Sequence, residues 1–379
     1  MRVFIPFTVF IIAFSCIEPY DFVIKDATPA LVVESLFSDK SFSETLTFPS
    51  DGRYHWVKLS ITSDVKNVRS LPVKDALVKL KINDGTEITY QQSLTSPGLY
   101  EIKDETFAAK PGVGYKLSIR YNEVSYESDW QNLPTVSVPA IGTISFREED
   151  VKKYRVEAGE NVIRNIKTIV AGIQVGANTN ENNPIYYRWD FTPTWIYIAP
   201  LSPSITRPGY KCWATNANYL NSYALRVDRA GNYTNDLFSL ETEHNERIWT
   251  QMSVLVNQYV LSEDYFYFFS EMKDRVEGNA FIDKPPFNLK SNIRAVEGQG
   301  EVVGFFGVVQ EQATRWYFSK DELTYKIEYS WKKGCETPYG PPLPCPPEPA
   351  PGFTACECKY CLEYSNGKTT NVKPAWWPE

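Results

Sequence analysis

Residues 76–90 read ALVKLKINDGTEITY. Apolar and polar side chains alternate on both sides of Asn83-Asp84-Gly85, so the apolar ones share one face of an extended chain. Asp-Gly between two such runs is a strong hairpin signal, because both residues tolerate the backbone that a tight turn requires. The stretch therefore predicts two antiparallel strands joined by a short turn.

Similar short runs continue this pattern on both sides of the hairpin. Residues 30–37 and 56–61 precede it, and Pro97-Gly98 and Pro111-Gly112 lead into further runs after it. Short strands at this spacing, with turn signals between them, favour a β-sandwich. We predict an Ig-like β-sandwich over residues 28–134, without the Cys-Trp-Cys pattern of a true immunoglobulin domain.

A larger β-rich domain is predicted over residues 139–333, after a linker bounded by two prolines. The chain of 379 residues is long enough for two domains. Gly304 and Gly307 would permit a close backbone approach or a bulge. Residues 200–247 are less regular, and whether they form an excursion or a cover stays open. The expected strands are residues 166–175, 184–191, 248–261 and 302–309, with residues 314–318 as the partner of the last.

One prominent α-helix is predicted near residues 262–277. Ser262 is a good N-cap, and two acidic residues follow it at the positive end of the helix dipole. We interpret the apolar side chains at helical spacing as a core face, with a ligand-binding face as the alternative. They are Tyr265, Phe268, Phe269, Met272 and Val276.

The first fifteen residues have the layout of a secretory signal. Arg2 precedes an apolar run that ends at Ser15-Cys16. A cysteine directly after the expected cut predicts a lipoprotein signal peptide over residues 1–15, lipidation of Cys16 and a tether over residues 16–27. An unmodified Cys16 after an ordinary secretory signal is the alternative. The run is short of the ~20 residues that a membrane-spanning helix needs.

The remaining six cysteines predict disulfides. An even set in an exported chain is typical of disulfide bonding, and the sequence leaves the pairing open. Cys356 and Cys358 are too close to pair comfortably, so a tail cysteine can reach back to Cys212. The C-x-C-x-x-C spacing is not a usual structural zinc pattern, although zinc is the alternative. We therefore expect residues 334–379 to form a Pro/Cys-rich, disulfide-bonded tail on the second domain. The disulfide candidates are Cys212, Cys335, Cys345, Cys356, Cys358 and Cys361.

Composition and motifs argue against several classes of function. A net charge of -7 gives no basic footprint, so nucleic acid is not an expected partner. Aromatic residues make up 15%, which suits β-sandwich cores as well as sugar-binding and protein-binding surfaces. The sequence contains no H-E-x-x-H, G-x-S-x-G or P-loop motif.

The titratable residues form no recognisable catalytic set. His55 and His244 lack a triad context, and we interpret both as structural or surface residues. Glu148-Glu149-Asp150 and Glu241 with Glu243 are interpreted as solvated loop charge, with a pair of glycosidase carboxylates as the alternative. We therefore expect no enzyme, no catalytic residue, no metal and no cofactor.

Several segments together resemble a known family. In this order, and with Cys16, they are similar to a Bacteroidota outer-membrane lipoprotein family described only as a domain of unknown function. The Pro-rich tail and residues 200–247 look less like that family. The segments are Glu18-Pro19, Ala30–Glu34, Asp75–Val78, Gly98–Tyr100, Tyr115–Ile119, Tyr186–Trp189, Ser291–Ile293, Val303–Phe306, Cys358 with Cys361, Gly367 and Lys373–Trp377.

The resemblance implies a lipid-anchored protein at the outer face of the outer membrane that accompanies SusC-like TonB-dependent transporters. It supplies no catalytic residues. Glu18 and Asp21 are a thin version of the acidic cluster that often marks export to the outer face, so the face of the membrane stays open.

Two functions of different class are therefore expected. The first is a non-enzymatic accessory or capping subunit of a TonB-dependent barrel in nutrient capture, with the ligand open. The second is a stand-alone surface module that binds a glycan or a peptide. A hydrolase using Glu148 or Glu243 is a third alternative.

Overall fold

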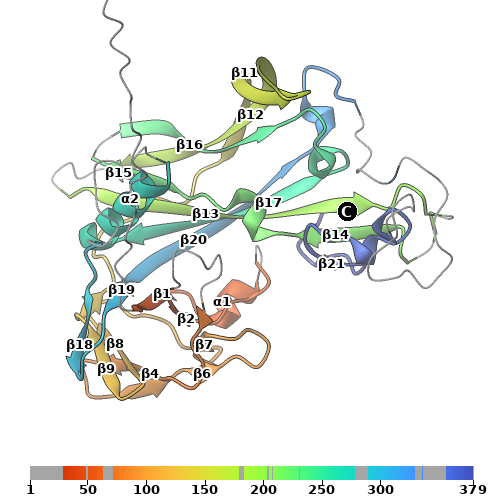
Figure 1. Ribbon diagram of the computed structural model, residues 1–379. Coiled ribbons are helices and arrows are strands. Elements are labelled where there is room, and N and C mark those ends of the chain that lie inside the picture. Colours follow the sequence, from red (N-terminus) through yellow and green to blue (C-terminus); the bar gives the residue numbers. More distant parts are fainter. Residues whose placement is uncertain are drawn as a thin grey trace, which may run out of the picture.

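The structure is a computed structural model that describes residues 29–47, 50–62, 71–178, 183–202, 205–206, 208–229, 231–277, 289–328, 335 and 356–378. It confirms a mainly β fold with one long helix and a disulfide-bonded C-terminal region. A small sandwich built largely from the N-terminal part of the chain lies against a larger sheet assembly (Figure 1).

The first layer of the sandwich contains the predicted hairpin. Leu80 lies opposite Ile88, and Gly85 adopts a φ of 92° in the turn. The sheet order is β18 (Ile293–Glu297), β9 (Val124–Ser128), β8 (Gly114–Tyr121), β4 (Leu77–Ile82) and β5 (Glu87–Thr89), with β10 (Gln131–Asn132) on β8.

The second layer of the sandwich begins with the first strand of the chain. Leu59 of this layer and Leu80 of the first layer are both fully buried in the shared core. A short helix, α1 (Phe42–Leu46), begins at a capping box made by Ser41 and Glu44. The strands are β1 (Leu31–Ser38), β2 (Trp56–Ile61), β7 (Leu99–Glu101) and β6 (Gln91–Gln92), with β3 (Leu71–Pro72) on β2 and β19 (Val302–Gly304) on β1.

Strand β1 also joins the two halves of the molecule. Its last residues, Phe37 and Ser38, pair in parallel with the start of β20. The second layer of the sandwich and part of the second half thus share one 12-stranded sheet among the described strands. Beyond β1 the order is β20 (Val308–Phe318), β17 (Met252–Leu261), β13 (Ile185–Ile198), β14 (Lys211–Thr215) and β21 (Lys368–Thr370), with β15 (Ala224–Asp228) also on β13.

The chain returns to the sandwich near residues 291–308. From sequence, the first domain was predicted to end at residue 134 and the second to begin at residue 139. Ile293 and Phe306 are buried in the sandwich core. Residues 302–309 were expected to form one strand, but β19 ends at Gly304 and β20 begins at Val308. Residues 314–318 continue β20 and are not its partner. Gly304, at a φ of 142°, marks the point where the chain leaves β19.

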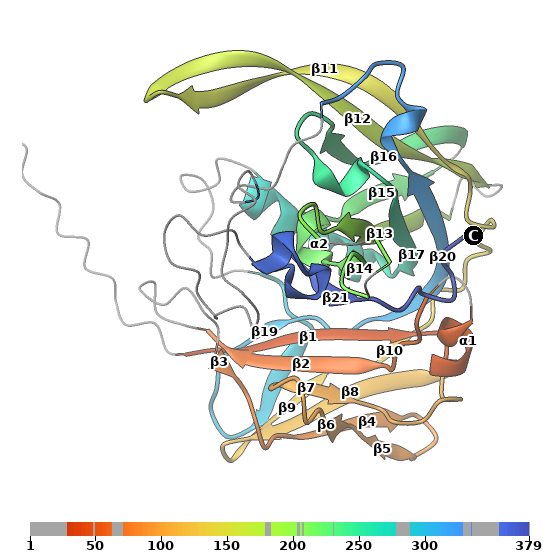
Figure 2. The same ribbon diagram turned by 90° about the vertical axis from the view of Figure 1, so that its right-hand side faces the viewer.

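A three-stranded sheet covers one face of the large sheet. It consists of β11 (Ile144–Glu157), β12 (Glu160–Asn178) and β16 (Gly231–Glu241). The core between the two sheets includes the fully buried Trp189 and Trp195. Figure 2 shows the β11–β12 hairpin reaching past the body as a curved arm. Residues 200–247, unassigned from sequence, supply β14, β15 and β16, so they are structural parts of both sheets.

The predicted helix is α2 (Glu263–Glu277). The Tyr265 backbone N–H donates to Ser262 Oγ at 3.4 Å, as expected for the N-cap. Tyr265, Phe268 and Phe269 are buried against Phe305, so the aromatic stripe is a core face.

The C-terminal region is held by two disulfides, Cys212–Cys361 and Cys335–Cys358. Short 3-10 helices stand at Ala217–Leu220, Glu246–Ile248, Lys320–Glu322, Cys356–Cys358 and Cys361–Glu363. Residues 1–28, with Cys16, lie outside the described residues, as do Cys345 and the side chain of Cys356. Within the described part of the chain, no helix is long and apolar enough to cross a membrane.

Candidate functional site

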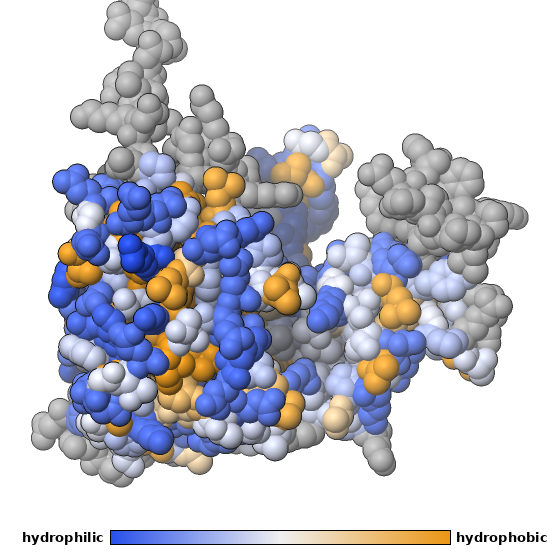
Figure 3. Space-filling model, turned by 90° about the horizontal axis from the view of Figure 1, so that it is seen from below, coloured by the Kyte–Doolittle hydropathy of each residue, from blue (hydrophilic) through white to orange (hydrophobic). Residues whose placement is uncertain are grey.

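A cleft of about 670 Å³ lies where the sandwich meets the large sheet. Helix α1 and the loop before β2 form one wall, and β13 with residues 217–223 forms the other. Strands β17 and β20 contribute Tyr259 and Glu311 to its floor. The opposite surface of the sandwich, seen in Figure 3, is mainly hydrophilic with smaller hydrophobic patches.

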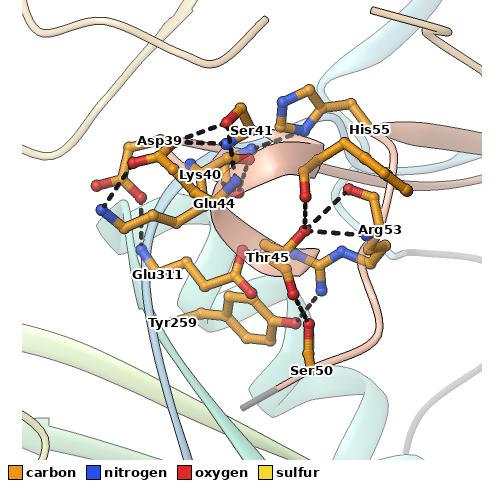
Figure 4. A network of polar contacts seen from close by, with 12 residues as sticks. Asp39, Lys40, Ser41, Glu44, Thr45, Ser50, Arg53, His55, Tyr259 and Glu311 are labelled. Atoms are coloured by element: carbon orange, nitrogen blue, oxygen red, sulfur yellow. Dashed lines mark hydrogen bonds and ion pairs between the residues drawn. The ribbon is translucent and has the colours of Figure 1, made fainter. Parts of the chain in front are cut away.

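The floor of the cleft is a buried network of charged and polar groups (Figure 4). Arg53 donates one hydrogen bond to Tyr259 Oη at 3.0 Å and another to the Glu311 carboxylate. Glu311 is 4% exposed, and its backbone N–H donates to Asp39 Oδ1 at 2.8 Å. Because Arg53 and Asp39 come from the sandwich, this network ties the two halves of the molecule together.

The network sets the protonation of its members. Burial alone lowers the pKa of Arg53, but Tyr259 and Glu311 outweigh it and hold the pKa above its ordinary value. Burial raises the pKa of Tyr259 and of Asp39. A cationic Arg53 beside a neutral tyrosine therefore persists at neutral pH.

A second fixed arginine stands in the wall of the cleft. Arg188 donates two hydrogen bonds of 2.8 Å to the Asp190 carboxylate, two residues further along β13. Its guanidinium lies 3.8 Å from the ring centre of Phe269 and 4.9 Å from that of Tyr223. The charge is thus paired with one carboxylate and stacked on aromatic rings.

Neutral polar and aromatic groups complete the lining. Trp56 and Tyr223 contribute rings, and Asn218, Asn221 and Asn257 contribute amides. With the charged groups of the floor engaged with each other, these neutral groups are the ones suited to contact a ligand. The lining thus offers rings for stacking and amides for hydrogen bonding.

His55 lies behind the floor and is a structural residue. The Ser38 N–H donates to Nδ1 at 3.5 Å, and Nε2 donates to the Phe107 carbonyl at 2.9 Å. The side chain is 3% exposed, and burial lowers its pKa to about 4. His244 lies in the loop after β16, at a φ of 55°, beside a separate cavity of about 340 Å³.

The carboxylates singled out from sequence are held by neighbouring side chains. Glu148 accepts hydrogen bonds from Thr324, which lower its pKa. Glu241 binds Lys153 and Arg155, and the hydrogen bond from Lys153 is the largest cause of its lowered pKa. The expected place in loops is wrong for Glu148, which lies on β11, and for Glu241, which lies on β16, whereas Glu243 lies in the turn after β16. Among the described residues, no group of three or more His, Cys, Asp or Glu could hold a metal ion.

The residues that build the floor and wall were missed in the sequence. Arg53, Glu311 and Tyr259 are far apart in the chain, so no local motif joins them. The available signal was a charge inside an otherwise apolar strand, as with Arg188 beside Trp189 and Glu311 after Val308-Val309. Such a charge needs a buried partner.

Comparison with known protein families places the chain in one of them. Residues 17–315 match the model of a domain of unknown function, DUF4249, and the chain belongs to that family. The matched range includes the sandwich, the arm and the cleft residues. No curated protein and no solved structure matches the chain.

Proposed function

We propose that this member of the DUF4249 family is a non-enzymatic outer-membrane lipoprotein, anchored through Cys16, that serves as an accessory or capping subunit of a SusC-like TonB-dependent transporter. In this role it captures a nutrient outside the barrel. The lipoprotein-type signal ahead of Cys16 supports the anchor, and several acyl chains together hold a protein firmly on a membrane. The family match begins directly after this cysteine.

The cleft is the observation that carries the proposal. Its volume of about 670 Å³ lies within the usual range of small-ligand sites. Aromatic rings and amides are suited to stacking and directional hydrogen bonds with a glycan or a peptide. The carboxylates of Glu311 and Asp190 are held by arginines, which favours capture without turnover.

The transporter role is tested by gentle-detergent extraction of C-terminally tagged protein from native outer membranes. We expect mass spectrometry to find a TonB-dependent barrel in stoichiometric amount. The Cys16→Ala variant is the control, and it should leave the membrane and lose the barrel. Recovery of the tagged protein without a barrel would contradict the accessory role.

A stand-alone glycan- or peptide-binding module is the second candidate, because this one chain supplies both walls and the floor of the cleft. This second function requires that the purified protein bind its ligand saturably in the absence of a barrel. Trp56→Ala should weaken such binding by about tenfold or more if the ring stacks on the ligand. Trp130→Ala is the matched control, because Trp130 is 46% exposed on the sandwich and lies outside the cleft.

A further inference from the structure

Strand β11 presents a long open edge. Among the described strands it pairs with β12 on one side and with none on the other. Its turn has two residues, Ala158 and Gly159, both at positive φ, and Glu157 pairs with Glu160 across it. In such a hairpin the closing pair exchanges hydrogen bonds, and every second residue back along the strand does the same.

The free backbone groups of β11 therefore belong to the even-numbered residues. Gln174 N–H donates to the Thr143 carbonyl just before β11, which fits bonding of the odd-numbered residues to β12. Residues 146, 148, 150, 152 and 154 direct their N–H and C=O groups to the open edge. A long edge of this kind is a template for another strand.

The side chains on this edge form a self-complementary charge pattern. Residues 148–153 read EEDVKK, three acidic residues and two basic ones on either side of Val151. In an antiparallel pair of two copies with Val151 opposite Val151, Asp150 faces Lys152 and Glu149 faces Lys153. Symmetry repeats each pair, so four opposite-charge pairs form across the edge.

Neighbouring registers place like charges opposite each other. An axis at Lys152 keeps Glu149 opposite Arg155 and Arg147 opposite Glu157, but it sets Lys152 opposite its own copy. An axis at Asp150 places Arg147 opposite Lys153, and an axis at Glu149 places Glu148 opposite Asp150, which are like-charge pairs. The Val151 register does place Arg147 opposite Arg155. Each of these arginines already has an acidic partner within its own chain. Glu149 and Lys153 are also paired within the chain, with Arg147 and Glu241, so the edge pairs add to these contacts as shared ion pairs.

The same register covers apolar side chains on the arm. Tyr154 is 77% exposed and Val156 is 71% exposed. Pairing about Val151 brings Tyr154 opposite Glu148 and Val156 opposite Phe146 of the second copy. The side chain of Asp150 is 65% exposed and lies 3.6 Å from Lys167, and Lys152 has no ion-pair partner among the described residues, so both can reach across the edge.

We infer that β11 is a homodimer interface that pairs antiparallel with β11 of a second copy about Val151. The two three-stranded sheets then join into one continuous sheet. This inference concerns the arm and is independent of the cleft and of any transporter.

A charge-swap experiment tests the pairing on the full chain, purified in mild detergent with micelles in large excess over protein. One variant carries Lys152→Glu with Lys153→Glu, and the other carries Glu149→Lys with Asp150→Lys. In sedimentation velocity we expect a dimer for the unmodified chain and self-association weakened by at least about tenfold in each variant. The two variants mixed together should form a heterodimer, because all four facing pairs become opposite in charge.

A cysteine scan fixes the register. Val151→Cys places a thiol opposite its own copy at a separation that suits a disulfide, so oxidation should produce a covalent dimer. Val156→Cys, exposed on the same arm but opposite Phe146, is the control and should give much less. A monomeric unmodified chain, a mixture without rescue, or equal cross-linking of the two cysteine variants would each overturn the inference.

Discussion

At the scale of single residues, the molecule places charge where a β protein usually places apolar side chains. Arg53 and Glu311 meet at the floor of the cleft, and Arg188 meets Asp190 in its wall. Buried charges are tolerated when each has a partner and its hydrogen bonds are made. The cleft floor is therefore rigid only as long as both members of each pair are present.

Removal of one member of the floor pair should be costly. Glu311→Leu leaves Arg53 without its carboxylate, and we expect the free energy of unfolding to fall by about 3 kcal/mol. Arg53→Met combined with Glu311→Leu should cost less than the sum of the two single changes. Denaturant unfolding with the disulfides intact measures this cycle. Lys58→Met is the control: it breaks the exposed pair with Glu34 and should change the free energy of unfolding by less than about 1 kcal/mol. Additive effects of the two changes at Arg53 and Glu311 would refute the coupling.

His55 should make stability depend on pH. Burial lowers its pKa from the usual 6.5 to about 4, so between these values the unfolded chain binds a proton that the folded chain does not. The contribution of the neutral imidazole is fully present above pH 6.5 and is lost as the pH falls toward 4, by about 3 kcal/mol in total.

The measurement compares the unmodified chain with His55→Phe at several pH values from 7.5 to 4. Other groups titrate in both proteins, so the difference between their free energies of unfolding isolates His55. The unmodified chain should lose stability relative to the variant as the pH falls. A difference that stays constant over this range would show that His55 is not buried as a neutral group.

At the scale of elements, backbone conformation decides where strands end and how closely they approach. Gly304 closes β19 against β1 at a φ of 142°. A Cβ on this residue would lie 2.1 Å from the Val33 carbonyl oxygen, which neither strand can relieve without moving. The packing of residues 302–308 into the sandwich thus depends on this one glycine.

Gly304→Ala should destabilise the protein by about 3 kcal/mol or more, from strain and steric overlap together. Gly85→Ala is the matched control, because Gly85 also has a positive φ but has open space where the Cβ would be. It should cost only about 1 kcal/mol. Thermal or denaturant unfolding of the two variants separates the two contributions. Equal losses would mean that the contact with Val33 carries no penalty.

At the scale of the whole molecule, the C-terminal region clamps the two halves. The Trp376 indole donates a hydrogen bond to Asp51 in the sandwich, and the Arg315 guanidinium lies 3.2 Å from a Trp376 ring centre. Tyr317 Oη donates to the Trp376 carbonyl at 2.7 Å. The disulfide between Cys212 and Cys361 holds this region to β14.

The two disulfides should contribute unequally to stability. Cys212 and Cys361 are 149 residues apart, whereas Cys335 and Cys358 are 23 apart. On the chain-entropy account, loss of the first costs about 5 kcal/mol and loss of the second about 3 kcal/mol. Paired Cys→Ala variants compared by unfolding in non-reducing buffer measure the difference. A greater loss from the Cys335–Cys358 pair would contradict the loop-length account.

Local patterns in the sequence determined many of the elements. The alternation around Asn83-Asp84-Gly85 predicted the β4–β5 hairpin, and Ser262 with the stripe after it predicted α2. The even set of cysteines predicted a disulfide-bonded C-terminal region. These features depend on residues close together in the chain, where the period of the side chains and the turn chemistry act directly.

Only the tertiary structure decided which strands share a sheet and which charges meet. β1 joins the sandwich to β20, residues 293–308 return to the first core, and Arg53 pairs with Glu311 across 258 positions. The alternation of apolar and polar side chains predicts that a strand has an apolar face. It does not predict the partner against which that face packs. The cleft, made of residues from both halves, could therefore appear only once the chain had folded.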